Sequence, residues 1–278
     1  MSDGYVVAGR VWPPRRRRPR RSILYLHGIQ SHGGWFEHSA SLLAEAGDAV
    51  ILPDRRGSGL NKAARGDTPS MQRWLDDLDE IAAWAAGRFG PPRTDVVGVS
   101  WGGKLAAAWA LRRPEQVVQL LLIAPGLYPK VDVGMRTRLA IGRCVVTRPR
   151  RRFEIPLSDP ALFTDNPAGR AFIRDDPLKL SRATARFFWH SRKLDRLLLR
   201  AGHARLRTDA TLLLAADDRI IRQQPTKNWF ERATGGAGRV LVLPGTHTLE
   251  FAAHPDRFYQ TLTSWVSQKH NPGNMREL

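Results

Sequence analysis

A serine between glycines lies at a point where a strand would have to turn sharply into a helix. The segment 95–109 reads DVVGVSWGGKLAAAW, in which β-branched residues precede Ser100 and an alanine-rich helical pattern follows it. Such a turn strains the residue at its apex, and Gly98 and Gly102 avoid collisions that any Cβ would cause beside it. This G-x-S-x-G pattern is typical of a nucleophile elbow, so we predict that Ser100 is a nucleophile. A glycine- and serine-rich connecting loop is the alternative.

A catalytic serine needs a base and an orienting acid, and two later strand ends offer them. His247 follows directly on an apolar run in LVLPGTH, and Asp217 and Asp218 close the preceding run in TLLLAADDRI. An unpaired buried carboxylate is costly, so two acids at a buried strand end suggest a function, and either could orient His247. The chain order serine, aspartate, histidine is that of an α/β-hydrolase triad. For His247 the alternative is an ordinary solvated turn residue.

The other histidines are less suited to catalysis by their positions. His27 and His32 flank a strand-end loop, but no acid or cysteine completes a metal-ligand set, so we predict neither a metal nor a cofactor. Asp54 is predicted to cap a glycine-rich turn rather than to catalyse. The remaining histidines lie on predicted helices, in the insertion described below or in the polar tail: His38, His190, His203, His254 and His270.

Length and composition indicate a folded protein with a sizeable core. The chain has 278 residues, of which 42% are hydrophobic, and nine tryptophans, which excludes a disordered chain. No apolar run reaches the roughly 18–20 residues of a membrane span, and the first residues lack the pattern of a signal peptide. The single cysteine, Cys144, excludes an internal disulfide framework and is predicted to be a small buried hydrophobe. These features favour a cytoplasmic location.

A formal net charge of +18 could indicate nucleic acid or an anionic membrane surface as a partner. Basic residues concentrate in RRRRPRR at 15–21 and in RPRRR at 148–152, and the first run is expected to form the turn of an opening hairpin. That run has no interleaved aromatic residues on which bases could stack, so no nucleic-acid partner is predicted. We predict a solvated, arginine-rich surface, with attraction to anionic lipid or substrate as the alternative.

The hydrophobic pattern predicts a mostly parallel sheet with helices on both faces. Continuous apolar runs, typical of strands buried on both sides, lie at 22–28, 48–53, 95–99, 117–125, 210–218 and 239–247. Helical patterns alternate with them at 35–47, 70–89, 223–233 and 250–267, and directly after Ser100. Such alternation indicates an α/β fold, in which ligands bind at the carboxyl ends of the strands.

The alternation stops between residues 126 and 205, where short helical pieces, prolines and arginines replace it and no convincing strand is visible. We therefore predict a core of residues 1–125 and 206–278 and a helical lid of residues 126–205, which would cover the carboxyl edge of the sheet. Some of its apolar residues either offer surface to an acyl chain or pack on the core: Leu139, Ile141, Val145, Val146, Phe187, Phe188 and Trp189.

Together these segments resemble a known family, the α/β-hydrolases of the monoacylglycerol lipase and lysophospholipase type, also called the serine aminopeptidase S33-like group. The resemblance covers nearly the whole chain and rests on HGIQSHGGWFEHSASLLAEAG, DRRGSGLN, GVSWGG, DPL, DDRI and GTH. It implies an α/β-hydrolase fold with a helical lid, and it makes Ser100 the nucleophile and His247 the base. In the family the acid is followed by any residue and then Ile or Val, which selects Asp218 over Asp217, with Ile220 as the packed anchor.

The resemblance also implies an oxyanion hole formed by the backbone N–H groups of Ile29 and Trp101. The sequence departs from the family at Val99, where the lipases usually carry histidine, and in its strongly basic lid, so the natural substrate stays open. We predict a serine hydrolase that cleaves lipid-like carboxylic esters through an acyl-enzyme on Ser100, with a small-molecule ester as its partner. Thioester hydrolysis or acyl transfer by the same triad is the enzymatic alternative. A ligand-binding protein on a hydrolase fold is the non-enzymatic one.

The basic lid suggests one further interaction. In VGMRTRLAIGRCVVTRPRRRF, at 133–153, apolar residues stand among arginines. Such a segment could lie on an anionic lipid surface with its apolar side chains partly inserted. The alternative is that these apolar residues pack on the core while the arginines are solvated.

Overall fold

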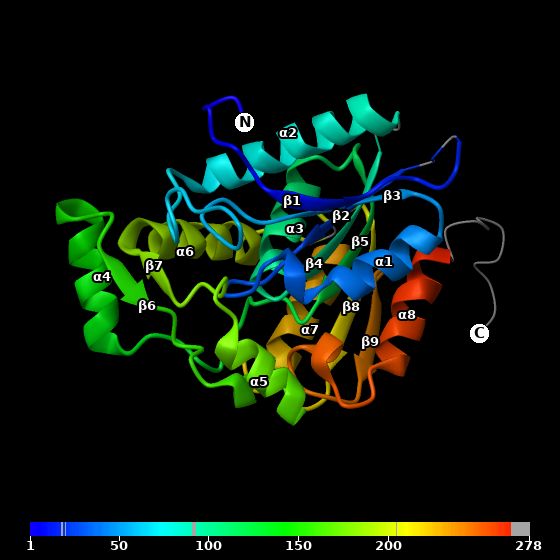
Figure 1. The fold of residues 1–278 in the computed structure, drawn as a ribbon. Helices are drawn as coiled ribbons and strands as arrows, with labels where there is room; N and C mark the ends of the chain where they lie inside the picture. The colour runs from blue at the N-terminus through cyan, green and yellow to red at the C-terminus, as the bar shows by residue number, and fades with distance from the viewer. Residues whose placement is uncertain (18, 20, 91–92, 204, 268–278) are drawn as a thin grey trace.

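Seven strands form one sheet in the order β1-β3-β2-β4-β5-β8-β9 (Figure 1). The computed structural model of the protein describes residues 1–267 apart from 18, 20, 91, 92 and 204. β1 pairs antiparallel with β3, and all other neighbours are parallel. The strands are β1 (Gly9–Trp12), β2 (Ser22–Leu26), β3 (Ala49–Pro53), β4 (Thr94–Val99), β5 (Val117–Ile123), β8 (Asp209–Ala215) and β9 (Arg239–Leu243).

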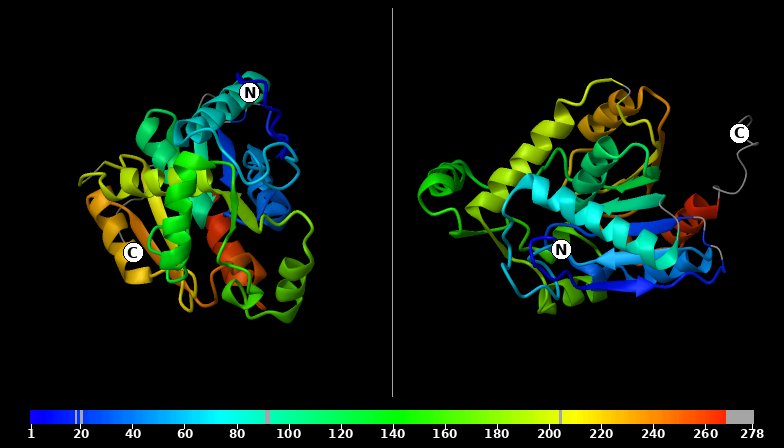
Figure 2. Two further views of the ribbon diagram at one scale, coloured as in Figure 1. Left: turned by 90° about the vertical axis from the view of Figure 1, so that its left-hand side faces the viewer. Right: turned by 90° about the horizontal axis from the view of Figure 1, so that it is seen from above.

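Helices cover both faces of the sheet, which confirms the predicted fold class (Figure 2). α1 (Glu37–Glu45) and α8 (Asp256–Ser267) pack together on one face, and α2 (Met71–Phe89) and α3 (Trp101–Arg112) on the other, while α7 (Gln223–Thr234) contacts β8. α2 begins where Ser70 Oγ accepts a hydrogen bond from the Arg73 N–H at 2.9 Å. It buries Trp74 and Leu78, and each fully buried leucine contributes about 1.5–3 kcal/mol. No helix in the described ranges is both long and apolar enough to cross a bilayer.

An insertion between β5 and β8 carries α4 (Met135–Thr147), β6 (Arg152–Glu154), α5 (Pro167–Asp175), β7 (Arg182–Thr184) and α6 (Ala185–Leu199). α6 packs against α3, and α4 lies farther out, against α6 (Figure 1). β6 and β7 pair antiparallel, so the expectation of an insertion without strands is wrong. Each has only three residues, too few to show the alternation by which a strand is recognised.

Two other expectations about the path of the chain are wrong. β1 and β2 do not form a hairpin, because β3 lies between them and pairs with both. The last helix begins at Asp256 rather than at Glu250. His254 precedes Pro255, and a residue in that position disfavours helical backbone angles. Leu249–Phe251 instead forms a short 3₁₀ helix, η3.

The basic run at 15–21 connects β1 to β2. The Arg16 N–H donates to the Gly47 carbonyl oxygen at 3.2 Å, and the Arg21 guanidinium pairs with buried Asp95 at 3.1 Å. Arg18 and Arg20 lie outside the described residues, as does His270. The described part of this run is therefore tied to the fold rather than wholly solvated.

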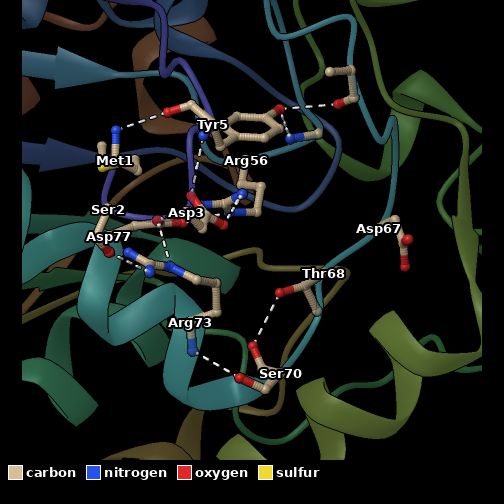
Figure 3. A network of polar contacts seen from close by, with 12 residues as sticks. Met1, Ser2, Asp3, Tyr5, Arg56, Asp67, Thr68, Ser70, Arg73 and Asp77 are labelled. Carbon is tan, nitrogen blue, oxygen red and sulfur yellow. Dashed lines mark hydrogen bonds and ion pairs between the residues drawn. The ribbon is translucent and has the colours of Figure 1, made fainter.

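A network of charged residues holds the turn that follows β3 (Figure 3). Arg56 of this turn pairs with Asp77 of α2 at 2.6 Å and with Asp3 at 3.0 Å. Arg73, one turn earlier on α2, pairs with the same Asp77 at 2.9 Å. Arg56 and Asp77 are buried, so losing either one would take a partner from a buried charge, which is unfavourable. The network therefore fixes the turn against α2.

Candidate active site

Ser100 lies between β4 and α3, where its backbone has a φ of 52° and a ψ of −120°. L residues rarely adopt a positive φ, so Ser100 is strained. A Cβ at Gly98 would lie 2.6 Å from the Cβ of Ala106, and a Cβ at Gly102 would lie 2.3 Å from the carbonyl oxygen of Leu26. The turn therefore requires glycine at both positions, as the spacing around Ser100 predicts.

A chain of hydrogen bonds runs from Ser100 into the interior through His247. His247 Nε2 lies 2.8 Å from Ser100 Oγ, and His247 Nδ1 lies 2.8 Å from Asp218 Oδ2. His247 and Asp218 are buried on the loops that follow β9 and β8, whereas Asp217 is exposed. The structure thus brings Ser100, His247 and Asp218 together and leaves Asp217 apart.

The surroundings of Asp218 favour its ionised form. Burial alone would raise the pKa of Asp218, but its interaction with His247 and the hydrogen bonds from the N–H groups of Ile221 and Ile220 hold it below the usual value. These two N–H groups donate to Oδ1 at 2.9 and 2.8 Å. Because a carboxylate only accepts, His247 Nδ1 carries the proton, and Nε2 is left to accept the proton of the Ser100 hydroxyl.

The backbone of Ile29 and Trp101 lies beside the Ser100 hydroxyl. A Cβ at Gly28 would be 3.9 Å from Ser100 Oγ, and Ile29 lines the same cavity as Ser100. Trp101 is the first residue of α3, where an N–H group has no acceptor within its own helix. N–H donors at these places could stabilise a negatively charged oxygen bound to Ser100.

The cavity over Ser100 is narrow. Its free volume is about 10 Å³, close to the smallest space that holds one water molecule. Phe163 of the insertion forms part of its wall and packs edge-on against the His247 ring, with centroids 6.2 Å apart. Trp35 packs against Phe163 from the core side at 6.0 Å. The insertion therefore narrows the approach to Ser100.

The histidines set aside in the sequence have other partners. His27 Nε2 accepts a hydrogen bond from the backbone N–H of Arg55 at 2.8 Å. His27 Nδ1 therefore carries the proton and donates to the Gly28 carbonyl oxygen, also at 2.8 Å. His32 Nε2 lies 3.1 Å from Asp176 of the insertion. Over the described part of the chain, no group of three or more His, Cys, Asp or Glu side chains is placed to hold a metal ion.

Most of the chain matches one family of hydrolases. The family described as "Serine aminopeptidase, S33" matches residues 17–250, a range that contains every residue of the site. The chain belongs to this family. The resemblance predicted from the sequence is thereby confirmed.

Three known proteins are similar to this chain. An uncharacterized abhydrolase domain-containing protein of Dictyostelium discoideum is 25% identical over 96% of this chain, which spans only 28% of that protein's length. Phospholipase YtpA of Bacillus subtilis is 24% identical over 79% of this chain and 84% of its own. The crystal structure of Paleococcus ferrophilus monoacylglycerol lipase superposes with a TM-score of 0.83 at 20% identity, over 95% of this chain and 99% of that one. This likeness confirms the α/β-hydrolase fold.

Two polar residues beside the site carry no clear signal in the sequence. Arg55 donates to backbone carbonyl oxygens of the loop after β2, and Glu250 of η3 accepts a hydrogen bond from Ser39 of α1. Both side chains are buried. From the sequence, both side chains are expected to be solvated, because Arg55 belongs to an arginine-rich chain and Glu250 falls in a predicted helix. The position of Arg55 directly after the strand-end residue Asp54 was the only available signal.

Glu250→Gln is expected to stabilise the protein at neutral and higher pH. Burial raises the pKa of Glu250 from 4.5 to about 7, against the opposing effect of the Ser39 hydrogen bond. Between these values the folded protein binds a proton that the unfolded chain has lost, so stability falls as pH rises through this window and is level above it. The loss amounts to about 3 kcal/mol. In thermal unfolding from pH 5 to pH 9, the stability of the variant relative to wild type should increase only within this window. A difference in stability that does not change with pH would contradict the expectation.

Proposed function

We propose that the protein hydrolyses carboxylic esters through an acyl-enzyme on Ser100. The observation that carries the proposal is the hydrogen-bond chain from Ser100 through His247 to Asp218, 2.8 Å at both steps. A serine hydroxyl is a weak nucleophile at neutral pH and needs a base while it attacks. His247 Nε2 takes its proton, and Asp218 holds the imidazole in the required tautomer and offsets the charge that forms.

The reaction then divides into acylation and deacylation. Ser100 Oγ attacks the ester carbonyl. The oxyanion of the tetrahedral intermediate accepts hydrogen bonds from the N–H groups of Ile29 and Trp101, and each of these hydrogen bonds lowers the barrier by roughly 3 kcal/mol. His247 gives its proton to the leaving alcohol, and the acyl group remains on Ser100. Water, deprotonated by His247, attacks this ester next, and collapse of the second intermediate releases the acid and restores the serine.

We infer a lipid-like ester of the monoacylglycerol or lysophospholipid type as the substrate class. The similar proteins named a monoacylglycerol lipase and a phospholipase support this class. So does an aromatic cluster at the cavity, in which the Trp35 ring packs against Phe163, Phe172 and Phe251 with centroids 6.0, 6.1 and 5.4 Å apart. When Phe163 moves aside, the rings around Trp35 would offer an acyl chain a large apolar surface.

The insertion, residues 126–205, acts in this proposal as a lid over Ser100. Phe163 brings it into the cavity wall, and its Asp176 accepts hydrogen bonds from His32 at 3.1 Å and from the Trp35 indole at 2.7 Å. Displacement of Phe163 would widen the path to the serine. Phe187, which could have contacted an acyl chain, is buried against Trp101 instead, so packing on the core is the better interpretation for that residue.

A substrate panel tests the proposed function. p-Nitrophenyl esters of increasing chain length are compared with monoacylglycerols, lysophospholipids and acyl-CoA, and a fluorophosphonate is used to label the active serine. We expect labelling at Ser100 and a kcat/KM that rises with the acyl chain length of the esters. Preference for acyl-CoA would indicate a thioesterase, and the absence of any turnover or labelling would favour a ligand-binding protein.

We also propose that α4 rests on an anionic lipid surface. Arg138 and Arg143 flank an apolar stripe of this helix, while Ile141 and Cys144 face the opposite way and are buried beside α6. An apolar stripe bordered by cations is typical of a helix that lies in a membrane interface. The stripe, about 40° wide at 100° per residue, consists of residues exposed by 68%, 69% and 84%: Met135, Leu139 and Val146.

Replacing Arg150, Arg151 and Arg152 with glutamine is expected to weaken binding to anionic vesicles by about two orders of magnitude, since each arginine near such a surface contributes about 1 kcal/mol. Activity on a short soluble ester should barely change. Co-sedimentation with phosphatidylserine vesicles measures the effect, with phosphatidylcholine vesicles as the control. Salt should weaken the wild-type interaction, because charges are screened within about 8 Å at physiological ionic strength. A wild-type protein that stays unbound at low salt would exclude this contact.

A further inference from the structure

We propose that Arg55 is a positioning residue of the oxyanion hole, whose guanidinium fixes and polarises the peptide between Gly28 and Ile29. The inference rests on the proposed function, because the direction of this peptide matters only if Ser100 attacks a carbonyl group. Arg55 is 8% exposed and lies in the turn after β3. Its neighbour Arg56 points to α2 and anchors the turn there (Figure 3).

Arg55 donates to two successive carbonyl oxygens of the loop after β2. Its Nη1 lies 2.9 Å from the Gly28 oxygen, and its Nη2 lies 2.9 Å from the Ile29 oxygen. His27 Nδ1 donates to the same Gly28 oxygen at 2.8 Å. Nη2 also donates to Ser58 Oγ at 2.6 Å, which orients the guanidinium. Two donors on one oxygen leave the Gly28 carbonyl little freedom to rotate.

The Gly28 carbonyl and the Ile29 N–H belong to the same peptide group. A trans peptide is planar, and its C=O and N–H bonds point in opposite directions. Holding the Gly28 oxygen therefore sets the direction of the Ile29 N–H, which is the donor proposed for the oxyanion. Hydrogen bonds to the carbonyl also polarise the peptide and make its N–H a stronger donor.

The same guanidinium contacts the side chain of Trp101, whose backbone N–H is the other proposed donor. Arg55 Cζ lies 4.6 Å from the centroid of the Trp101 ring and 5.5 Å from that of Phe187. The Trp101 indole N–H donates to Ser191 Oγ at 2.9 Å, which fixes the ring on which the cation rests. One buried cation thus joins the loop that carries Ile29 to the first residue of α3.

The charge of Arg55 is held chiefly by carbonyl oxygens and ring faces. Burial lowers the pKa of Arg55 to about 9, with nearby Asp54 acting in the opposite sense, so the side chain is protonated at neutral pH. A buried cation is costly, and an apolar side chain of similar volume often stabilises a fold at least as well. Packing alone therefore does not explain an arginine at this position, whereas its hydrogen bonds to the Gly28 and Ile29 carbonyl oxygens do.

Arg55→Lys tests this role, because lysine keeps the charge but lacks the planar fork that reaches two carbonyl oxygens. We expect kcat on a short soluble ester to fall by about 10- to 100-fold, less than the 10²- to 10³-fold cost of losing a whole donor. KM should stay within about threefold. The Ki of a trifluoromethyl ketone, which binds as a hemiketal oxyanion, should rise by the factor by which kcat/KM falls. Arg55→Gln, measured alongside, should lose at least as much.

Arg65→Lys is the matched control. Arg65 also donates to backbone carbonyl oxygens, those of Gly59, Leu178 and Lys179, at 3.0, 2.7 and 3.1 Å, but none of them belongs to the oxyanion loop. This variant should keep the wild-type kcat and Ki. End-point titration with a fluorophosphonate counts the folded sites of each variant, so rates are compared per site.

The outcomes separate this inference from the proposed function. If wild type is active and both Arg55 variants keep its kcat and its Ki per titrated site, the inference is wrong. The same holds if the Arg65 control loses as much as Arg55→Lys, since the effect would then be structural. If wild type is neither labelled nor active on any ester, the proposed function itself fails.

Discussion

Replacing Ser100 with alanine is expected to lower ester hydrolysis by roughly 10⁶-fold, the size of effect that follows removal of a serine nucleophile. The exchange removes one oxygen at the end of the sheet and leaves a residue with the same positive φ, so the fold should be unchanged. Hydrolysis of p-nitrophenyl butyrate measures the loss, and thermal unfolding within a few degrees of wild type shows that the protein is folded. Covalent labelling of the alanine variant by a fluorophosphonate would mean that another residue is the nucleophile.

Asp218→Asn is expected to lower kcat by about 10⁴-fold. An asparagine amide can donate as well as accept, so it no longer fixes the proton on His247 Nδ1 and no longer offsets the imidazolium charge. The pKa of Asp218 lies below the usual value, so this carboxylate is ionised at the pH of the assay. The effect should therefore appear at every pH at which the enzyme is active.

Asp217→Asn provides the matched control, because the two residues are adjacent and the chemical change is the same. Asp217 is exposed, and its exchange should change kcat by less than about threefold, as is usual for a surface substitution. Equal losses in the two variants, or a larger loss at Asp217, would show that Asp218 does not orient the base.

The core of the fold could be predicted because its strands are buried on both faces. β2, β3 and β4 are buried along their whole length, and this burial imposes the continuous apolar runs visible in the sequence. Short or edge elements carry less of that signal. β1 is an edge strand that alternates between exposed and half-buried residues, and nothing in its sequence specifies that it pairs with β3 rather than β2.

The candidate site was predictable where the backbone itself constrains residue types. The turn at Ser100 needs glycine on both sides because their Cβ atoms would strike Ala106 and Leu26. Choosing Asp218 over Asp217 depended on the resemblance to the family, since two adjacent acids at a strand end look equivalent in the sequence. In the structure, Asp218 is buried and accepts hydrogen bonds from the N–H groups of Ile220 and Ile221.

The surroundings of the site could not be predicted, because they depend on contacts between distant segments. Phe163 of the insertion forms part of the cavity wall, and Arg55 reaches back to the loop at Gly28. Neither contact has a periodic or local pattern. The exposed stripe of α4 could be predicted only in part, since both membrane contact and packing on the core were compatible with its sequence. Ile141 is buried, as expected for packing, but Leu139 is exposed.

Trapping the acyl group on the enzyme is the most direct test of the proposed mechanism. The protein is mixed with p-nitrophenyl butyrate, quenched with acid during turnover and digested for peptide mass spectrometry. We expect a burst of p-nitrophenol that matches the number of active sites, and a butyryl group on the peptide that contains Ser100. An unmodified Ser100 during steady turnover, or a butyryl group on another residue such as Cys144, would contradict an acyl-enzyme on Ser100.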